Sequence, residues 1–246
     1  MASAARSHRE GTWLVREAMD RALADALDGI AGEGLPSPDP VLLDVGGRGR
    51  PYEALAAARL GLRGYRPRHL AVDAAPGGGV DAAATAEALP VRDGAAGLVL
   101  CTQMLEHVPD PQAAVGEMAR VLAPGGACLL TTHGTWFYHP DPQDYWRWTS
   151  AGLRLLFQRA GFARVEVRPV GGTKLAVAAL ALTALERAEG NTLLAELGRA
   201  VVGPANAVAG RLLLGKVTGR GSVPGELVLN YVVTARKPAL SSPSLE

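Results

Sequence analysis

The sequence predicts an α/β protein built on a doubly wound, mostly parallel sheet. Short apolar runs bounded by Gly, Pro or Asp alternate with amphipathic segments of helical spacing, which is typical of a parallel sheet with helices on both faces. The 246 residues suffice for one large domain with a small appendage. Hydrophobic residues make up 48% and charged residues 20% of the chain, so we expect a sizeable core and no general disorder.

The predicted elements follow one another in a regular order. Residues 12–28 carry apolar side chains at helical spacing and predict a first helix. Residues 29–40, rich in Gly and Pro, predict a break after it. Thr149 or Ser150 is expected to cap a later helix that ends at Gly161. The other predicted elements, in chain order, are strand 41–45, helix 52–60, strands 69–72 and 97–101, helix 112–122 stopped by Pro124-Gly125-Gly126, and strand 127–132. The capped helix follows and runs through residue 159, and strands 164–168 and 227–234 come after it.

Two Ala/Leu-rich segments, 173–189 and 191–214, predict helices inserted before the last strand. The chain then divides into an N-terminal helical lead (1–39), a main domain (40–172 and 222–238) and a helical insert (173–221). We interpret the insert as a substrate-pocket cap or a homodimer surface. Contact with a membrane or a lipid-linked substrate stays open, because cations flank its apolar stretches: Lys174, Arg187, Arg199, Arg211, Lys216 and Arg220.

Charge and cysteine content exclude several classes of function. With 25 Lys+Arg against 24 Asp+Glu, the chain lacks the excess of cations that nucleic-acid binding requires. Cys101 and Cys128 are too few for a disulfide framework or a four-ligand zinc site. We expect them to be buried thiols. Residues 1–10 are polar, and the apolar run 175–185 is shorter than the roughly 20 residues that span a bilayer. A cytoplasmic location is therefore expected.

Features at two expected strand ends predict a nucleoside site. Residues 43–52 form a strand, a glycine turn and a helix start, and glycines let the backbone approach a ligand closely. Asp73 ends the next strand, where a carboxylate is suited to binding both hydroxyls of a ribose. Tyr52 stands at the third glycine position of the dinucleotide fingerprint, and the sequence contains no Gly-Lys-Ser/Thr loop. NAD, FAD and ATP are therefore disfavoured as ligands.

Five ordered motifs carry a resemblance to a known family: Asp44-Val45-Gly46-Gly47-Arg48, Asp73, Ala86-Glu87-Ala88-Leu89-Pro90, Leu105-Glu106-His107-Val108 and Leu122-Ala123-Pro124-Gly125-Gly126. With these motifs the sequence resembles class I S-adenosylmethionine-dependent methyltransferases of the type-11 group. The segment Asp144-Tyr145-Trp146-Arg147-Trp148-Thr149 resembles a bacterial subgroup. The resemblance covers about residues 40–170 and the last strand. It implies a seven-stranded Rossmann-like methyltransferase fold and S-adenosylmethionine as cofactor.

The resemblance also implies roles for single residues at the cofactor. Asp73 takes the ribose hydroxyls. Arg48 departs from the pattern where the family usually has its second glycine, and Thr85 departs from it where an acid often meets the adenine. The remaining implied contacts are Asp44, Gly46, Gly47 and Gly49 around the methionine end, Thr85 and Ala86 beside the adenine, and Gln103 and Met104 near the sulfonium.

On the acceptor side, the resemblance implies a methyltransferase enzyme (EC 2.1.1.-). The acceptor atom is an oxygen, a nitrogen or a carbon, and we expect methylation on oxygen of a small-molecule, glycan-linked or lipid-linked acceptor. His133 is the first candidate base and His107 the second. Aromatic residues between positions 136 and 148 predict a lid or a pocket wall. The substrate-binding candidates are Trp136, Tyr138, Tyr145 and Arg147, the last of which either pairs with Asp144 or binds an acidic acceptor.

Two further readings concern metal and the loss of catalysis. The spacing of His133, His139, Asp141 and Asp144 matches no zinc signature, so we expect no metal. The departures at Arg48 and Thr85 leave open a non-catalytic methyltransferase-like binding subunit. A nucleotide-dependent oxidoreductase is a third reading, which Tyr52 disfavours.

Overall fold

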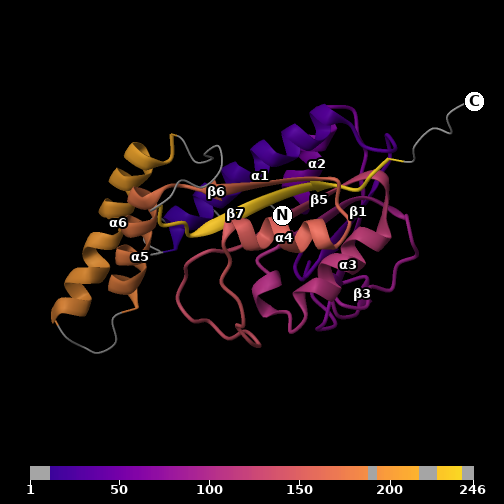
Figure 1. Ribbon diagram of the computed structural model, residues 1–246. Coiled ribbons are helices and arrows are strands. Elements are labelled where there is room, and N and C mark those ends of the chain that lie inside the picture. The colour runs from indigo at the N-terminus through magenta and orange to yellow at the C-terminus, as the bar shows by residue number, and fades with distance from the viewer. Residues whose placement is uncertain (1–11, 188–192, 216–225, 240–246) are drawn as a thin grey trace, which may run out of the picture.

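The chain forms a seven-stranded sheet with helices on both faces, and two helices project from one end of it (Figure 1). A computed structural model describes residues 12–187, 193–215 and 226–239. The strands are β1 (Val41–Val45), β2 (Arg68–Asp73), β3 (Ala82–Ala83), β4 (Ala96–Thr102), β5 (Leu122–His133), β6 (Arg164–Val170) and β7 (Asn230–Arg236). The helices are α1 (Trp13–Glu33), α2 (Glu53–Gly61), the 3₁₀ helix η1 (Leu105–His107), α3 (Pro111–Val121), α4 (Ser150–Arg159), α5 (Thr173–Glu186) and α6 (Leu193–Leu213).

The strand order determines where a ligand can bind. The sheet runs β3-β2-β1-β4-β5-β7-β6. The pairings among β1 to β5 are parallel, and β7 is antiparallel to both β5 and β6. The chain moves outward from β1 to β3 and then returns to β4 on the other side of β1. A ligand site is expected at this switch point, at the carboxyl ends of β1 and β4. The predicted doubly wound, mostly parallel fold is confirmed.

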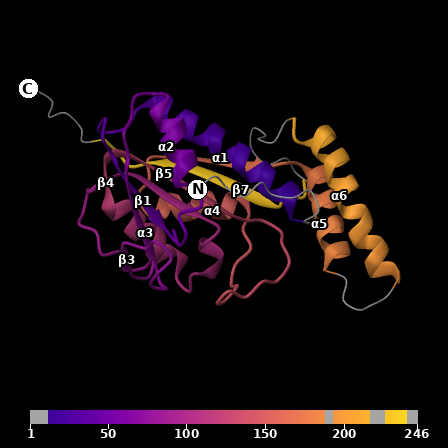
Figure 2. The same ribbon diagram turned by 180° about the vertical axis from the view of Figure 1, so that it is seen from behind.

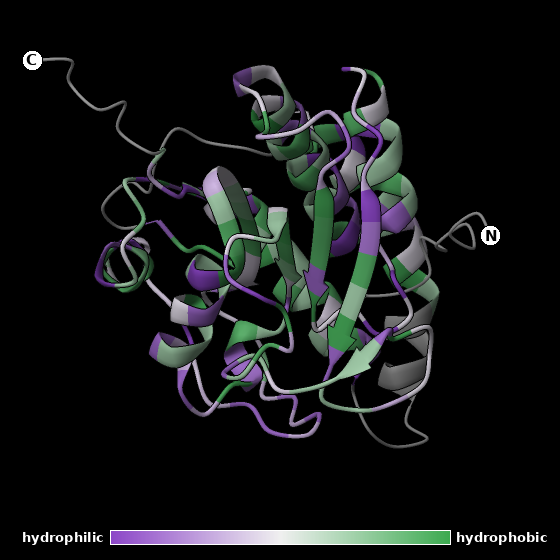
Figure 3. Ribbon diagram, turned by 90° about the vertical axis from the view of Figure 1, so that its right-hand side faces the viewer, coloured by the Kyte–Doolittle hydropathy of each residue, from purple (hydrophilic) through white to green (hydrophobic). Residues whose placement is uncertain are grey.

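Alternating side chains of the strands form two hydrophobic layers. Leu42 belongs to the layer under α1 and α2, whereas Leu43 belongs to the layer under α3 and α4. The view from behind shows α1 and α2 lying together along one face (Figure 2). Hydrophobic strand segments lie between the helical layers (Figure 3). The sheet is thus buried on both faces, which explains why its central strands read as continuous apolar runs rather than alternating ones.

The first helix is longer than the sequence predicts. α1 continues through residues 29–33, with Gly34 as its C-cap, so the predicted break from residue 29 is wrong in that part. Ile30 and Ala31 are buried in the core. Arg236 of β7 donates hydrogen bonds to the carbonyl oxygens of Ile30 at 2.8 Å and Gly34 at 2.6 Å. These tertiary contacts hold the last turn of the helix despite its glycines.

Two strands also differ from the prediction. β5 begins at Leu122 rather than at residue 127, and the Pro124-Gly125-Gly126 segment lies inside it. The β4–β5 register shifts between Ala96 and Leu98 to accommodate this segment. β3 has two residues and is too short for any apolar pattern to indicate it. The cap at Thr149 is confirmed, since its side chain accepts a hydrogen bond from the N–H of Gly152.

The two cysteines are buried on the neighbouring strands β4 and β5, as expected. Burial raises the pKa of Cys101 well above its usual range and that of Cys128 to about 12. The thiolate is the reactive form. We therefore expect the native protein to leave a thiol reagent such as dithionitrobenzoate unreacted, and guanidinium-unfolded protein to release two equivalents of product. Rapid release from the native protein would contradict this burial.

The helices α5 and α6 pack side by side and project beyond the sheet (Figures 1 and 2). They correspond to the predicted insert helices, although α5 ends at Glu186 and residues 191–192 lie outside the described residues. α6 touches α1 closely, because a Cβ atom on Gly210 would lie 2.8 Å from the Trp13 ring. Within the described ranges, none of the helices combines the length and apolarity that crossing a membrane requires.

Candidate functional site

The carboxyl end of β1 runs into a tight glycine turn. Gly46 has φ +76°, which favours glycine, and a Cβ atom there would lie 2.6 Å from Cγ of Met104. A Cβ atom on Gly47 would lie 2.6 Å from Cγ of Asp44. The N–H groups of both glycines donate to the carbonyl oxygen of Val72, at 2.8 and 3.2 Å. Glycine is therefore needed at both positions for this close packing.

Asp44 lies beneath the turn and is only 1% exposed. Its Oδ2 atom lies 3.4 Å from Nε2 of His69 and has no hydrogen-bond partner among the described residues. Nη1 of Arg50 lies 3.3 Å from Nδ1 of His69, and Nη2 of Arg50 donates to Asp81 at 2.7 Å. His69 thus links Asp44 to an arginine–aspartate pair, and this chain of contacts supports the turn from below.

Asp73 lies at the tip of β2, beside the turn. Its Oδ1 atom accepts a hydrogen bond from the N–H of Ala75 at 2.9 Å, and the side chain is partly exposed. The next loop folds over the turn, since the N–H of Gly49 donates to the carbonyl oxygen of Gly78 at 2.7 Å. Arg48 is exposed, and its Cγ atom would lie 3.0 Å from a Cβ atom on Gly78. The Arg48 side chain therefore lies against this loop at the surface.

Gln103 and Met104 follow β4 at the same edge of the sheet. Gln103 has φ +49°, and its Nε2 atom donates to Oγ1 of Thr131 at 3.1 Å. Its Oε1 atom is buried and finds no hydrogen-bond partner in the described part of the chain. A buried oxygen without a partner is a natural acceptor for an N–H group of a ligand.

Thr85 and Ala86 follow β3, which pairs with the end of β2. The N–H of Ala84 donates to the carbonyl oxygen of Asp73 at 3.0 Å. Thr85 is exposed and Ala86 is buried. The fold thus brings this segment next to Asp73, as a ribose and its adenine require.

These observations fit the S-adenosylmethionine that the resemblance implies. The glycine turn packs tightly on Met104 and Asp44 at Gly46 and Gly47 and is open at Gly49, where a Cβ atom would meet no described atom within 4 Å. The Asp73 carboxylate is accessible at the adjoining strand tip. The Gln103 oxygen is an unused acceptor suited to the amino group of the methionine end.

A loop of residues 134–149 covers the carboxyl end of β5. The N–H of Tyr145 donates to the carbonyl oxygen of Glu106 at 2.8 Å, and the N–H of Trp148 donates to the carbonyl oxygen of His133 at 3.0 Å. The loop is therefore anchored both to η1 and to the end of β5.

Arg147 and Asp144 hold this loop together internally. Two guanidinium nitrogens of Arg147 donate to the two carboxylate oxygens of Asp144, at 2.5 and 2.7 Å. Arg147 also donates to the carbonyl oxygen of Phe137 at 2.9 Å. The hydrogen bonds from Arg147 hold the pKa of Asp144 far below its usual range. Of the two readings of Arg147, the structure shows the pair with Asp144.

The aromatic residues of the loop divide into two groups. The Trp136 ring stacks on the His133 ring with centroids 5.6 Å apart and planes 2° apart. Tyr138 is 72% and Tyr145 is 50% exposed. Trp136 thus covers His133, whereas the two tyrosines lie at the surface.

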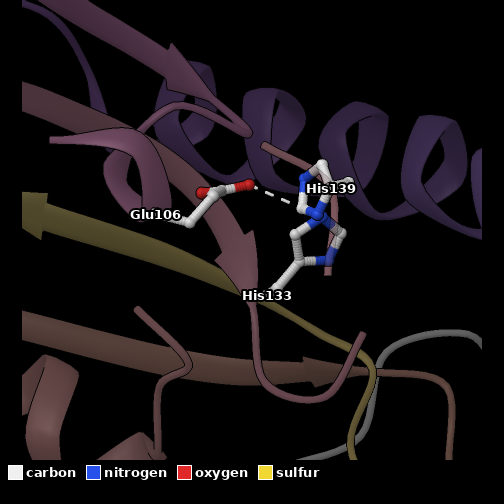
Figure 4. A group of neighbouring side chains, drawn as sticks. All are labelled: Glu106, His133 and His139. Carbon is white, nitrogen blue, oxygen red and sulfur yellow. Dashed lines mark ion pairs between the residues drawn. The ribbon is translucent and has the colours of Figure 1, made fainter. Parts of the chain in front are cut away.

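Beneath the loop, Glu106, His133 and His139 converge from three segments of the chain (Figure 4). Glu106 is fully buried, and its Oε1 atom lies 3.5 Å from Nε2 of His133. Burial raises the pKa of Glu106 and lowers that of His133 to about 3, so the His133 ring is neutral at pH 7. His107 flanks the group, with its ring centroid 5.2 Å from that of His139.

Two residues of the site, His69 and Glu106, carry no individual role in the sequence interpretation, and His139 enters it only in a group of residues that was judged not to bind metal. Glu106 stands inside the Leu-Glu-His-Val motif, which was a usable signal. His69 is an unremarkable strand residue in the sequence, and His139 lies in a loop. Only the fold brings His69 to Asp44 and His139 to Glu106.

The central segment of the chain is similar in sequence to known methyltransferases. Residues 43–130 match the family model described as a methyltransferase domain. An uncharacterized methyltransferase of Mycobacterium sp. (strain JLS) is 39% identical over 95 residues, 37% of each chain. A ubiquinone biosynthesis O-methyltransferase of Psychrobacter cryohalolentis is 57% identical over 35 residues, 14% of each chain. The chain therefore spans less than half the length of these curated relatives.

The whole fold has relatives among solved structures. A SAM-dependent methyltransferase from Archaeoglobus fulgidus superposes with a TM-score of 0.53 at 14% identity, covering 91% of this chain and 93% of the other. At this identity the likeness concerns the fold. Residues 43–130 thus match the methyltransferase-domain model, and the chain has the α/β fold of solved SAM-dependent methyltransferases.

Proposed function

We propose that the protein transfers a methyl group from S-adenosylmethionine to a hydroxyl oxygen of a small-molecule, glycan-linked or lipid-linked acceptor. The observation that carries this proposal is the pairing of the close-packed glycine turn with the accessible Asp73 at adjoining strand tips, within a methyltransferase-domain sequence. The name of the Psychrobacter relative, an O-methyltransferase, supports oxygen as the methylated atom.

In this proposal Asp73 accepts hydrogen bonds from both ribose hydroxyls, and Ala86 packs beside the adenine with Thr85 at its edge. The turn at Gly46, Gly47 and Gly49 lies against the methionine end, with Asp44 supporting it from below. Gln103 accepts a hydrogen bond from the amino group, and Met104 lines the region of the sulfonium. When bound, S-adenosylmethionine supplies an electrophilic methyl group, so the chain mainly aligns the acceptor and excludes water.

His133 is the first candidate for holding the proton of the acceptor hydroxyl, because it ends β5 at the same edge of the sheet. Trp136 covers it. His107 is the second candidate, at the end of η1. Tyr138, Tyr145 and the Asp144–Arg147 pair supply the outer surface for the acceptor.

A direct test incubates the protein with radiolabelled S-adenosylmethionine and a panel of hydroxylated acceptors, and follows transfer of the label. His133→Gln is expected to lower kcat by about 100-fold, the usual contribution of a positioned base, while the affinity for S-adenosylmethionine measured by calorimetry stays the same. A fall in cofactor affinity with unchanged kcat would instead place His133 at the cofactor.

The competing function is a methyltransferase-like binding subunit without catalysis. The exposed Arg48 motivates it, because a cation replaces the family glycine. Absence of S-adenosylmethionine binding by calorimetry, together with a stable complex with another protein, would favour this reading over the enzyme.

The projecting helices support contact with a lipid surface that carries the acceptor. Val208 and Leu212 of α6 are exposed, and Arg211 lies exposed beside them, as on interfacial helices. The protein should cosediment with vesicles that contain phosphatidylglycerol. The variant Val208→Glu/Leu212→Glu should bind them at least about tenfold more weakly. Leu62→Glu, at an equally exposed site just after α2, should not weaken binding. Dimerisation through α6 without vesicle binding would contradict this assignment.

A further inference from the structure

We propose that Glu106, His133 and His139 form a binding site for a divalent transition-metal ion, with Zn²⁺ as the representative ligand. This inference deepens the proposed function, since the ion would lie where the acceptor hydroxyl is expected. It rests on that function for its chemical role, but the metal site itself can be tested without any methyl transfer.

The three ligands come from three separate segments that the fold brings together. Glu106 lies in η1, His133 is the last residue of β5, and His139 lies in the 134–149 loop. One carboxylate oxygen and one nitrogen of each ring lie within 4.8 Å of one another. Figure 4 shows the carboxylate of Glu106 and the two rings pointing toward a common point. Two imidazoles and one carboxylate are the protein ligands of catalytic zinc sites that keep an open position.

Only one of the two carboxylate oxygens of Glu106, Oε1, is available to bind a cation. Its Oε2 atom accepts a hydrogen bond from Oγ1 of Thr132 at 2.9 Å. Its Oε1 atom is fully buried and makes no hydrogen bond within the described ranges. A buried carboxylate oxygen without a donor is costly unless a cation or a proton occupies the space before it. That oxygen is the one directed at His133.

His139 is oriented as metal-ligating histidines usually are. Its Nδ1 atom lies 3.0 Å from the carbonyl oxygen of Phe137 and 3.3 Å from Oδ2 of Asp144. A histidine that donates Nδ1–H to a carbonyl or carboxylate leaves Nε2 unprotonated and free to bind a metal. Asp144 is itself held by Arg147, so this outer contact is rigid. The carbonyl–histidine–metal arrangement is thus present on the His139 side.

The spacing of the ligand atoms allows an ion with little movement. Bonds of about 2.0–2.2 Å in a tetrahedral site separate the ligand atoms by roughly 3.3 Å. Glu106 and His133 already lie 3.5 Å apart. The largest separation among the ligand atoms is at most 4.8 Å, so the His139 loop must close by at most about 1.5 Å to complete the site.

The donor set also selects the class of ion. Two neutral imidazoles suit zinc and its transition-metal neighbours, whereas magnesium and calcium prefer oxygen ligands. Arg147 donates its hydrogen bonds to Asp144 and to a carbonyl oxygen of its own loop, so it does not neutralise Glu106 in place of an ion.

A bound ion would change how an acceptor is activated. It would lower the pKa of a hydroxyl bound at its open position. The methyl group would then pass from the sulfonium to this oxygen, so that the S–C bond breaks as the O–C bond forms, S-adenosylhomocysteine leaves, and the hydroxyl proton goes to His107 or to water. His133 would then act as a ligand rather than as the proton acceptor. The loss of His139 separates the two roles, because it removes a ligand and leaves His133 in place.

The test measures zinc in tag-free protein that has been stripped with a chelator, incubated with Zn²⁺ and dialysed. Wild type is expected to retain about one zinc per chain. Glu106→Gln and His139→Gln, which keep the side-chain size or hydrogen-bonding capacity, are expected to bind zinc at least about tenfold more weakly. His107→Gln is the matched control, because it removes a neighbouring imidazole outside the ligand set. Thermal unfolding of each variant verifies that it is folded.

Substitution with Co²⁺ provides a second readout, since histidine ligation gives a visible absorption band that His139→Gln should change. Failure of wild type to retain zinc, or equal retention by Glu106→Gln, would overturn the metal site and leave a shared proton between Glu106 and His133. Calorimetry with S-adenosylmethionine on the same samples separates the outcomes. Cofactor binding without zinc contradicts only the metal site, whereas zinc without cofactor binding contradicts the proposed function.

Discussion

Replacing Asp73 by Ala is expected to weaken S-adenosylmethionine binding by about 100-fold, as measured by calorimetry. The carboxylate would lose two charge-assisted hydrogen bonds to the ribose, each contributing about 1.5 kcal/mol. Asp73 stands at the tip of β2 beside the glycine turn, with one oxygen already fixed by the N–H of Ala75. That bond holds the carboxylate in place before a ligand arrives.

The same bond makes a second variant necessary. Asp73→Asn retains an acceptor for the Ala75 N–H and is expected to fold normally, yet to bind the cofactor more weakly than wild type because the charge is lost. Asp93→Ala removes an exposed carboxylate that pairs with Arg120 at 2.6 Å, far from the turn in sequence, and is the control. Equal affinity in wild type and Asp73→Ala would refute the ribose assignment.

Gly46→Ala is expected to destabilise the protein by about 2–4 kcal/mol and to abolish cofactor binding. Two physical effects add at this position. The left-handed backbone costs a residue with a Cβ atom about 1 kcal/mol, and the added methyl group would lie 2.6 Å from Met104, an overpacking that costs about 1–3 kcal/mol. Urea unfolding monitored by circular dichroism measures the change in the free energy of unfolding.

Gly49→Ala is the matched control for this clash. Gly49 has the same φ of +76°, but a Cβ atom there would meet no described atom within 4 Å. Its expected cost is therefore only the backbone term of about 1 kcal/mol. Equal destabilisation by the two substitutions would show that the packing of the turn on Met104 is not what requires glycine at position 46.

Local sequence patterns determined the class of fold and predicted where the cofactor binds. Apolar runs such as 41–45 and 97–101 predict buried strands because a doubly covered sheet needs apolar residues on both faces. The glycine turn and Asp73 were recognisable because each follows such a run directly, and parallel strands place their carboxyl ends at one edge. These signals need only neighbouring residues along the chain.

Only the tertiary structure decided the rest of the site. Asp44 turns beneath the glycine turn to His69, and Glu106 meets His133 and His139. Partners of this kind are separated by tens of residues, and no local propensity records which side chains the sheet order brings together. The helix α1 likewise continues through Gly29 and Gly32 because tertiary contacts with β7 outweigh the low helix propensity of glycine. Residues that are neighbours in the sequence thus specified where the strands end. Long-range packing specified which buried polar side chains come together at those ends.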